Sequence, residues 1–137
     1  MTQAVSVYSM EKPKCVLEAS NASVSVVQTG NTTLLDIGIP DGVEKLFLLI
    51  TVATQAIDAF VVQGKAKPSD TYATLLSAAG DYTSTNGFNL MASGDLTAQA
   101  VGVGWLLLNT RGLSNVKVLA SGGNATPSVV SVSARGT

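Results

Sequence analysis

Short apolar runs separated by turn-forming residues recur along the whole chain, and this spacing limits the possible folds more than any other feature. The clearest pair is Trp105–Leu108, a continuous apolar run, and Asn115–Ala120, in which polar and apolar residues nearly alternate. The turn formers Asn109–Gly112 join them. About eight to ten such runs, with turn signals roughly every 8–12 residues, are typical of a β-sandwich or jelly roll. The sequence therefore predicts an all-β fold with little helix.

Two of these runs are apolar on both faces. Lys45–Thr54 is the most apolar segment of the chain, and Trp105–Leu108 is similar. Such runs are typical of central strands that are covered on both sides. We expect Lys45–Thr54 to form a hairpin with Ala59–Gly64, and Gly102 and Gly104 to let Trp105 lie over a neighbouring strand.

The remaining strands follow from alternation and from turn residues. Pro40-Asp41-Gly42 predicts a turn, because proline fixes its own φ and glycine accepts a positive φ. Residues 65–94 are less regular, and Asp70 is suited to cap a short helical turn over 71–79. A strand is the alternative there, but the pattern favours a short helix or an irregular crossover. Further strands are expected at 15–19, 23–28, 34–37, 99–109 and 128–134.

The length of 137 residues favours a single domain. We expect residues 1–20 to form an N-terminal arm or edge strand and residues 21–137 to form one β-sandwich domain. The first residues do not resemble a secretory signal. The longest apolar run, Leu46–Ala53, is far shorter than the ~20 residues of a membrane-spanning helix, so no contact with a membrane is expected.

The composition argues against several classes of function. The net charge is -1, with 8 basic and 9 acidic residues scattered along the chain, so no nucleic-acid partner is expected. The chain has no histidine, on which much acid–base catalysis and transition-metal binding depend. Its single cysteine, Cys15, is suited to be a small buried residue. We therefore expect no enzyme activity and no catalytic, cofactor-binding or metal-binding residues.

Only 12% of the residues are charged, about half the usual ~25%. A surface with so few charges is expected to be partly buried against other proteins or other copies, so a homo-oligomer is expected. The aromatic residues of segment 65–94 can instead pack beneath loops, and Arg111 can instead pair with a nearby acid. The candidate interface residues are Val5, Val7, Tyr8, Tyr72, Tyr82, Phe88 and Arg111.

Between Gly42 and the end of the chain, seven short segments share a common style of apolar runs and turns: 46–52, 59–64, 81–83, 93–96, 104–112, 116–121 and 129–134. In these segments the chain resembles the small all-β capsid decoration (cement) proteins of tailed phages. The resemblance implies a β-sandwich that forms a homo-oligomer (a trimer is possible), docks on the major capsid protein and has no catalytic residues.

The function expected from this resemblance is a virion structural protein, assembled in the host cytoplasm, that stabilises the capsid shell, with residues 1–20 as its docking arm. Two alternatives stay open. One is another virion component, such as a tail-associated or fibre-associated β-module. The other is a carbohydrate-binding β-sandwich, which the aromatic content of 5% makes less favourable.

Overall fold

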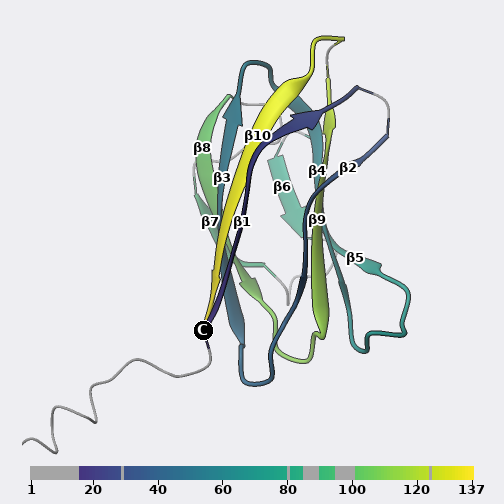
Figure 1. Cartoon of the computed structure of the whole chain (residues 1–137), viewed down its shortest axis with the longest axis vertical. Coiled ribbons are helices and arrows are strands. Elements are labelled where there is room, and N and C mark those ends of the chain that lie inside the picture. The colour runs from purple at the N-terminus through teal and green to yellow at the C-terminus, as the bar shows by residue number, and fades with distance from the viewer. Residues whose placement is uncertain (1–15, 29, 80, 85–89, 95–100, 124) are drawn as a thin grey trace, which may run out of the picture.

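The computed structural model describes residues 16–28, 30–79, 81–84, 90–94, 101–123 and 125–137, and these form two antiparallel five-stranded sheets (Figure 1). Sheet A has the order β1 (Leu17–Val26), β10 (Ser128–Gly136), β3 (Lys45–Ala53), β8 (Gly102–Asn109) and β7 (Leu90–Gly94). Sheet B has the order β2 (Thr32–Gly38), β9 (Asn115–Gly122), β4 (Ile57–Lys65), β5 (Ala73–Ala79) and β6 (Asp81–Ser84). Within these ranges, no helix is long and apolar enough to span a bilayer.

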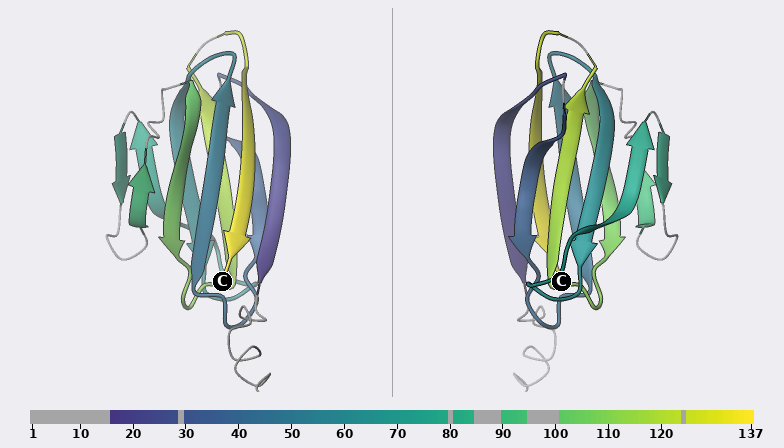
Figure 2. Two further views of the ribbon diagram at one scale, coloured as in Figure 1. Left: turned by 90° about the vertical axis from the view of Figure 1, so that its left-hand side faces the viewer. Right: turned by 90° about the vertical axis from the view of Figure 1, so that its right-hand side faces the viewer.

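The strand order is that of a jelly roll. Apart from the outermost strands β6 and β7, the sheets read β1-β10-β3-β8 and β2-β9-β4-β5. Among these strands the chain crosses to the other sheet at every connection except the one between β4 and β5, as expected for two Greek keys folded onto each other. Figure 2 shows sheet A in its left panel and sheet B in its right panel. The predicted all-β sandwich or jelly roll is confirmed.

The core lies between the sheets and follows from the two-residue period of the strands. Along β3 the side chains alternate, so that Leu46, Leu48 and Ile50 point inward and are fully buried. Phe60 and Val62 on β4 face them from sheet B and are equally buried. Burial of such a side chain contributes about 1.5–3 kcal/mol, so each of these residues adds substantially to the apolar stabilisation.

Two of the predicted elements differ from the structure. The helical turn over 71–79 is wrong: Ala73–Ala79 is β5, which pairs with β4 and β6. The free-energy differences between helix and strand propensities are small, and pairing with the edge of β4 decides the conformation. The separate strands at 15–19 and 23–28 are one strand, β1, interrupted by a bulge between Asn21 and Val24.

The hairpin predicted for 45–54 and 59–64 is also wrong. β3 pairs with β10 and β8 in sheet A, and β4 pairs with β5 and β9 in sheet B. The short connection between β3 and β4 therefore carries the chain from one sheet to the other. By contrast, the turn predicted at Pro40–Gly42 is confirmed: Gly42 has φ +89°, and the Val43 N–H donates to Pro40 O at 3.1 Å.

Thr54 is the residue at which the chain leaves sheet A. Its φ is +73°, and the Gln55 N–H donates to Ala53 O at 2.9 Å, which closes a three-residue turn around it. A β-branched residue is strained at positive φ, whereas glycine is not.

We expect Thr54→Gly to raise the free energy of unfolding by about 0.5–1 kcal/mol, because the relief of strain exceeds the entropy that glycine adds to the unfolded chain. Denaturant unfolding measures this change. The same substitution at Thr51, within β3, is the control and should lower the free energy of unfolding by about 1 kcal/mol. A loss of stability in Thr54→Gly would contradict the assignment of strain to this turn.

Candidate interaction surface

The outer face of sheet A carries a row of large apolar side chains on its central strand β3 and on the neighbouring strand β8. Because β3 alternates, Phe47 and Leu49 point away from the core, opposite to Leu48. The register aligns Phe47 with Leu107, Leu49 with Trp105 and Thr51 with Val103. We call the following five side chains the apolar face: Phe47, Leu49, Val103, Trp105 and Leu107.

The apolar face is substantially open to solvent. Phe47 and Leu49 are each 39% exposed and Val103 is 54% exposed. Within a single chain these strands are covered on one side only, because each sheet of the sandwich has only one face against the other sheet. Trp105 does lie over a neighbouring strand: its ring stacks on Phe47 of β3, with centroids 5.8 Å apart and planes 22° apart. This stacking gives the centre of the face a defined shape.

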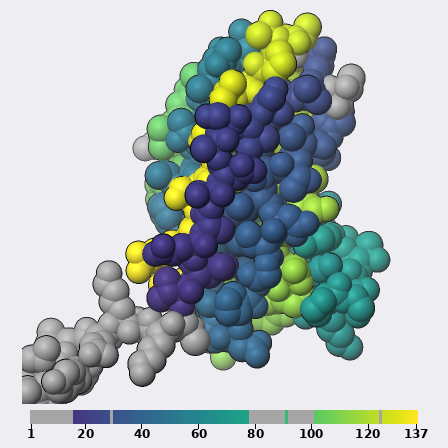
Figure 3. Space-filling view, in the orientation of Figure 1, coloured from purple at the N-terminus to yellow at the C-terminus, as the bar shows by residue number. Residues whose placement is uncertain are grey.

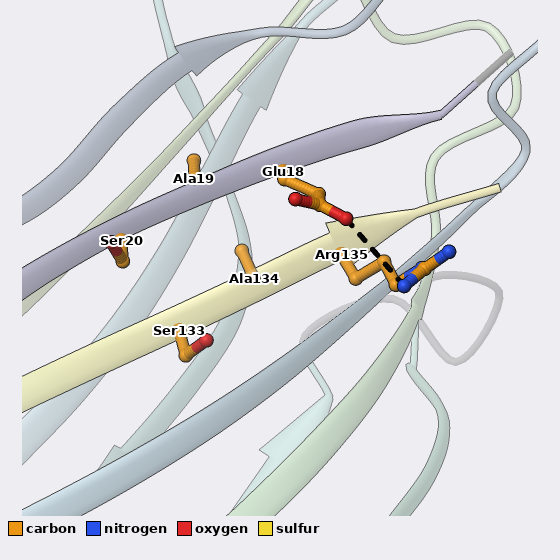
Figure 4. Close-up of a pocket in the computed structure, with 6 residues that line it drawn as sticks. All are labelled: Glu18, Ala19, Ser20, Ser133, Ala134 and Arg135. Atoms are coloured by element: carbon orange, nitrogen blue, oxygen red, sulfur yellow. Dashed lines mark ion pairs between the residues drawn. The ribbon is translucent and has the colours of Figure 1, made fainter.

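Polar side chains border the apolar face on the β10 and β1 side. Ser133 and Arg135 of β10 lie beside Glu18 and Ser20 of β1, along a shallow groove of about 450 Å³ (Figure 4). Arg135 Nη1 lies 3.5 Å from Glu18 Oε1. Figure 3 shows this edge of the sandwich, where β1 lies along β10. The charged groups of the border, which include Lys45 at the start of β3, lie at one end of the strands.

The outer face of sheet B has a different character. The Tyr72 hydroxyl donates to Asp36 Oδ1 at 2.6 Å, and the ammonium groups of Lys65 and Lys117 lie 4.5 and 4.9 Å from the centre of the Tyr72 ring. These four residues, the tyrosine cluster, come from β2, β4, β9 and the loop that follows β4. Cation–π and hydrogen-bond contacts hold this loop against the sheet. Sheet B thus presents a charged, internally paired surface, whereas sheet A presents an apolar one.

The environment of Tyr72 changes its acidity. Burial, the hydrogen bond to Asp36 and the negative charge of Asp36 raise the pKa of Tyr72 to about 12. Since the folded chain then holds this proton more tightly than the unfolded chain, the resulting stabilisation is complete below pH ~10 and is lost as the pH rises through about 12.

We expect a spectroscopic titration of the folded chain to show one tyrosine that ionises near pH 12, and Tyr72→Phe to remove that step. Asp36→Asn should lower the pKa of Tyr72, because it removes the negative charge beside the hydroxyl. An unchanged high-pH step in Tyr72→Phe would contradict the assignment.

The predicted interface residues do not form a single surface in the part of the chain that the structure describes. Val5, Val7, Tyr8 and Phe88 lie outside the described residues, and Tyr82 is described only as a backbone position in β6. Tyr72 belongs to the tyrosine cluster on sheet B. Arg111 lies separately, in the turn between β8 and β9.

The side chain of Arg111 is 78% exposed, and its Nε lies 3.6 Å from Glu44 Oε1. This is the ion pair expected from the alternative interpretation of Arg111. An exposed pair of this kind contributes about 0–1 kcal/mol to stability.

Sequence reasoning missed the apolar face as a surface, although its residues were recognised as strand residues. The sequence signal for this surface was the apolar character of both faces of Lys45–Thr54, because a sandwich of two sheets covers only one face of each strand.

Among the residues that the structure describes, no three His, Cys, Asp or Glu side chains converge as metal ligands would. The arrangement is suited to contacts with a protein surface.

Comparison with known proteins finds a likeness in fold. The crystal structure of the SPBc2 prophage-derived protein YomS is similar, with a TM-score of 0.56, and the match covers 93% of this chain and 99% of that chain. The two sequences are 9% identical, so the likeness shows a shared fold alone. No protein-family model matches the chain, and no curated protein matches its sequence.

Proposed function

We propose that this chain is a structural protein of a tailed-phage particle, which decorates the capsid by binding the major capsid protein. The observation that carries the proposal is the jelly-roll fold shared with a prophage-derived protein over nearly the full length of both chains. The sequence resemblance to phage decoration proteins points to the same kind of particle. In this role the chain acts through protein contacts rather than through catalysis.

The edge of sheet A suits a role based on protein contacts. β1 is the outermost strand on its side of the sheet and pairs there with β10. An edge strand offers backbone hydrogen-bonding groups to an extended segment of another protein. β1 begins at Leu17, so the last four residues of the predicted arm, residues 1–20, form the start of this strand. The predicted arm and this edge of sheet A therefore belong to one continuous stretch of the chain.

Binding to particles tests the proposal. Capsid shells that lack the chain and isolated tails, both from the phage that encodes it, are each mixed with the purified full-length protein and sedimented. We expect saturable binding to shells, at a fixed number of copies per capsid subunit, and none to tails. Binding to tails alone would support the tail-associated alternative, and binding to neither would refute a virion role. Specific binding in a glycan screen, without particle binding, would favour the carbohydrate-binding alternative.

Variants of the predicted arm locate the contact. Val5→Asp combined with Val7→Asp should weaken shell binding at least tenfold if the arm docks by burying apolar side chains, since each change removes an apolar contact and adds a charge. The matched control is Val27→Asp combined with Val101→Asp, which changes two exposed valines outside the predicted arm. Equal loss in both double variants would contradict a specific role of the arm.

A further inference from the structure

We propose that the apolar face is the binding site for a second copy of this chain, packed sheet to sheet about a two-fold axis that runs across the strands. The inference goes beyond the proposed function, because it concerns the assembly of the chain itself. It rests on the exposure of the five side chains, the area of the sheet and the distribution of charge over its outer face.

The exposure of the face argues that something covers it. Phe47, Leu49 and Val103 contribute exposed apolar area on adjacent strands, and they continue into the partly buried Trp105 and Leu107. A contiguous apolar patch of this kind, bordered by polar residues, marks a contact surface. Trp105 and Phe47 are aromatic residues at its centre, as is common in the energetically important part of an interface.

The size of the face suits packing of one sheet on another. The whole outer face of sheet A contains the apolar face and its polar border. With five strands about 4.8 Å apart and about 3.4 Å per residue over the nine residues of β3, it has an area of roughly 700 Å². A stable interface of standard size buries about 800 Å² on each partner. Two copies therefore come close to the area that a stable dimer needs when the whole outer face of sheet A, with the apolar face at its centre, lies in the interface.

The charges on the face select the orientation. Lys45, Arg135 and Glu18 lie at the end of the sheet where β3 begins and β10 ends. The other end carries Thr51, Ala53 and Val129, which have no charge. If two copies packed with their β3 strands parallel about an axis along β3, the two Lys45 ammonium groups would meet. An antiparallel arrangement instead places each charged end against an uncharged one.

The antiparallel arrangement fixes which residues approach one another. A two-fold axis across the middle of β3 and β8 passes near Leu49 and Trp105, so that each lies opposite its own equivalent. Phe47 then faces Thr51 of the second copy, and Leu107 faces Val103 of the second copy. Packed sheets lie about 10 Å apart, which lets side chains of this size interdigitate.

Analytical ultracentrifugation of the full-length chain over a range of concentrations is the first test. We expect the wild type to be a dimer, and Leu49→Lys to raise its dissociation constant at least about 100-fold, because two ammonium groups would meet at the axis. Leu119→Lys, on the outer face of sheet B, is the matched control and should leave the dimer intact. Val103→Lys provides a second variant at a more exposed position, so that a folding defect of Leu49→Lys would not leave the proposal untested.

Several outcomes would overturn this proposal. A wild type that stays monomeric at all concentrations would do so, as would a dimer unaffected by both lysine variants. A trimer or larger ring that the variants disrupt would contradict the two-fold axis. If the chain is monomeric but Leu49→Lys weakens its binding to shells, then a capsid protein and not a second copy covers the face.

Cross-linking tests the axis directly. In a Cys15→Ser background, Leu49→Cys should form a covalent dimer with a bifunctional thiol cross-linker of about 10 Å span, because equivalent positions face each other at the axis across packed sheets about 10 Å apart, too far for a direct disulfide. Thr33→Cys, exposed on the outer face of sheet B, is the control and should remain monomeric on denaturing gels. Cross-linking of both variants to the same extent would refute the assigned geometry. These measurements need no phage particle, so a failure to bind shells would leave their result unchanged.

Discussion

Phe60→Ala is expected to lower the free energy of unfolding by about 3–5 kcal/mol, a large share of the 5–15 kcal/mol that stabilises a typical domain. Phe60 is fully buried on β4, the middle strand of sheet B, and is among the largest buried side chains of the chain. Its neighbour across the strand pair is Ala120, whose methyl group is too short to fill the space that the ring would leave. The loss therefore includes both the transfer of apolar surface and a residual cavity.

Val61→Ala is the matched control for this prediction. Val61 follows Phe60 in the same strand, points to the outer face of sheet B and is only half-buried. We expect it to lower the free energy of unfolding by about 1 kcal/mol or less, since little apolar contact is lost. Denaturant unfolding of the two variants under the same conditions gives the comparison. Similar losses in both would mean that β4 does not alternate between core and surface as described.

The alternation of side chains explains why much of the fold could be predicted. Period-two patterns located most of the strands, and the apolar character of Lys45–Thr54 correctly indicated a central strand. The pattern could not show which face of that strand is covered. Phe47 and Leu48 are equally apolar, and only the position of sheet B decides that Leu48 is buried and Phe47 is exposed.

Pairing between strands was harder to predict, because it depends on residues far apart in the sequence. A connection as short as 54–56 can close a hairpin or lead across a sandwich. Here β10 and β8 occupy both edges of β3, and Thr54 turns the chain toward sheet B. The strand at 73–79 is a similar case, since it depends on the edge offered by β4.

The surfaces of the two sheets likewise depend on residues that are far apart in the sequence. Tyr72 is recognisable from sequence as an aromatic residue in an irregular segment. Its partners Asp36 and Lys117 lie on strands that only the tertiary structure brings together. The apolar face is likewise formed by β3 and β8, which are distant in the chain and adjacent in sheet A. The sequence thus indicated which side chains are suited to form contacts. Which of them lie together on one surface follows only from the tertiary structure.

Gly122 lies at a second position where a small change should have a large effect. It ends β9, and its N–H donates to Val27 O at 2.8 Å, next to the end of β1 in the other sheet. A Cβ atom at Gly122 would lie 2.9 Å from the carbonyl oxygen of Val26 and 3.2 Å from the carbonyl carbon of Val27. These are backbone atoms, and Val26 is held by its pairing with Ser128 of β10, so they cannot move aside as a flexible side chain would.

We therefore expect Gly122→Ala to lower the free energy of unfolding by about 2–4 kcal/mol, as the sum of overpacking and a weakened hydrogen bond. Gly123→Ala is the matched control: its Cβ would lie 3.6 Å from Asp58 Cβ, an ordinary contact, and its stability should be unchanged or slightly raised. Calorimetric melting of both variants provides the measurement. If Gly122→Ala melts like Gly123→Ala, the close approach of β9 to residues 26–27 is not a constraint on the fold. If only Gly122→Ala is destabilised, steric contact between the two sheets at this point is what requires a glycine.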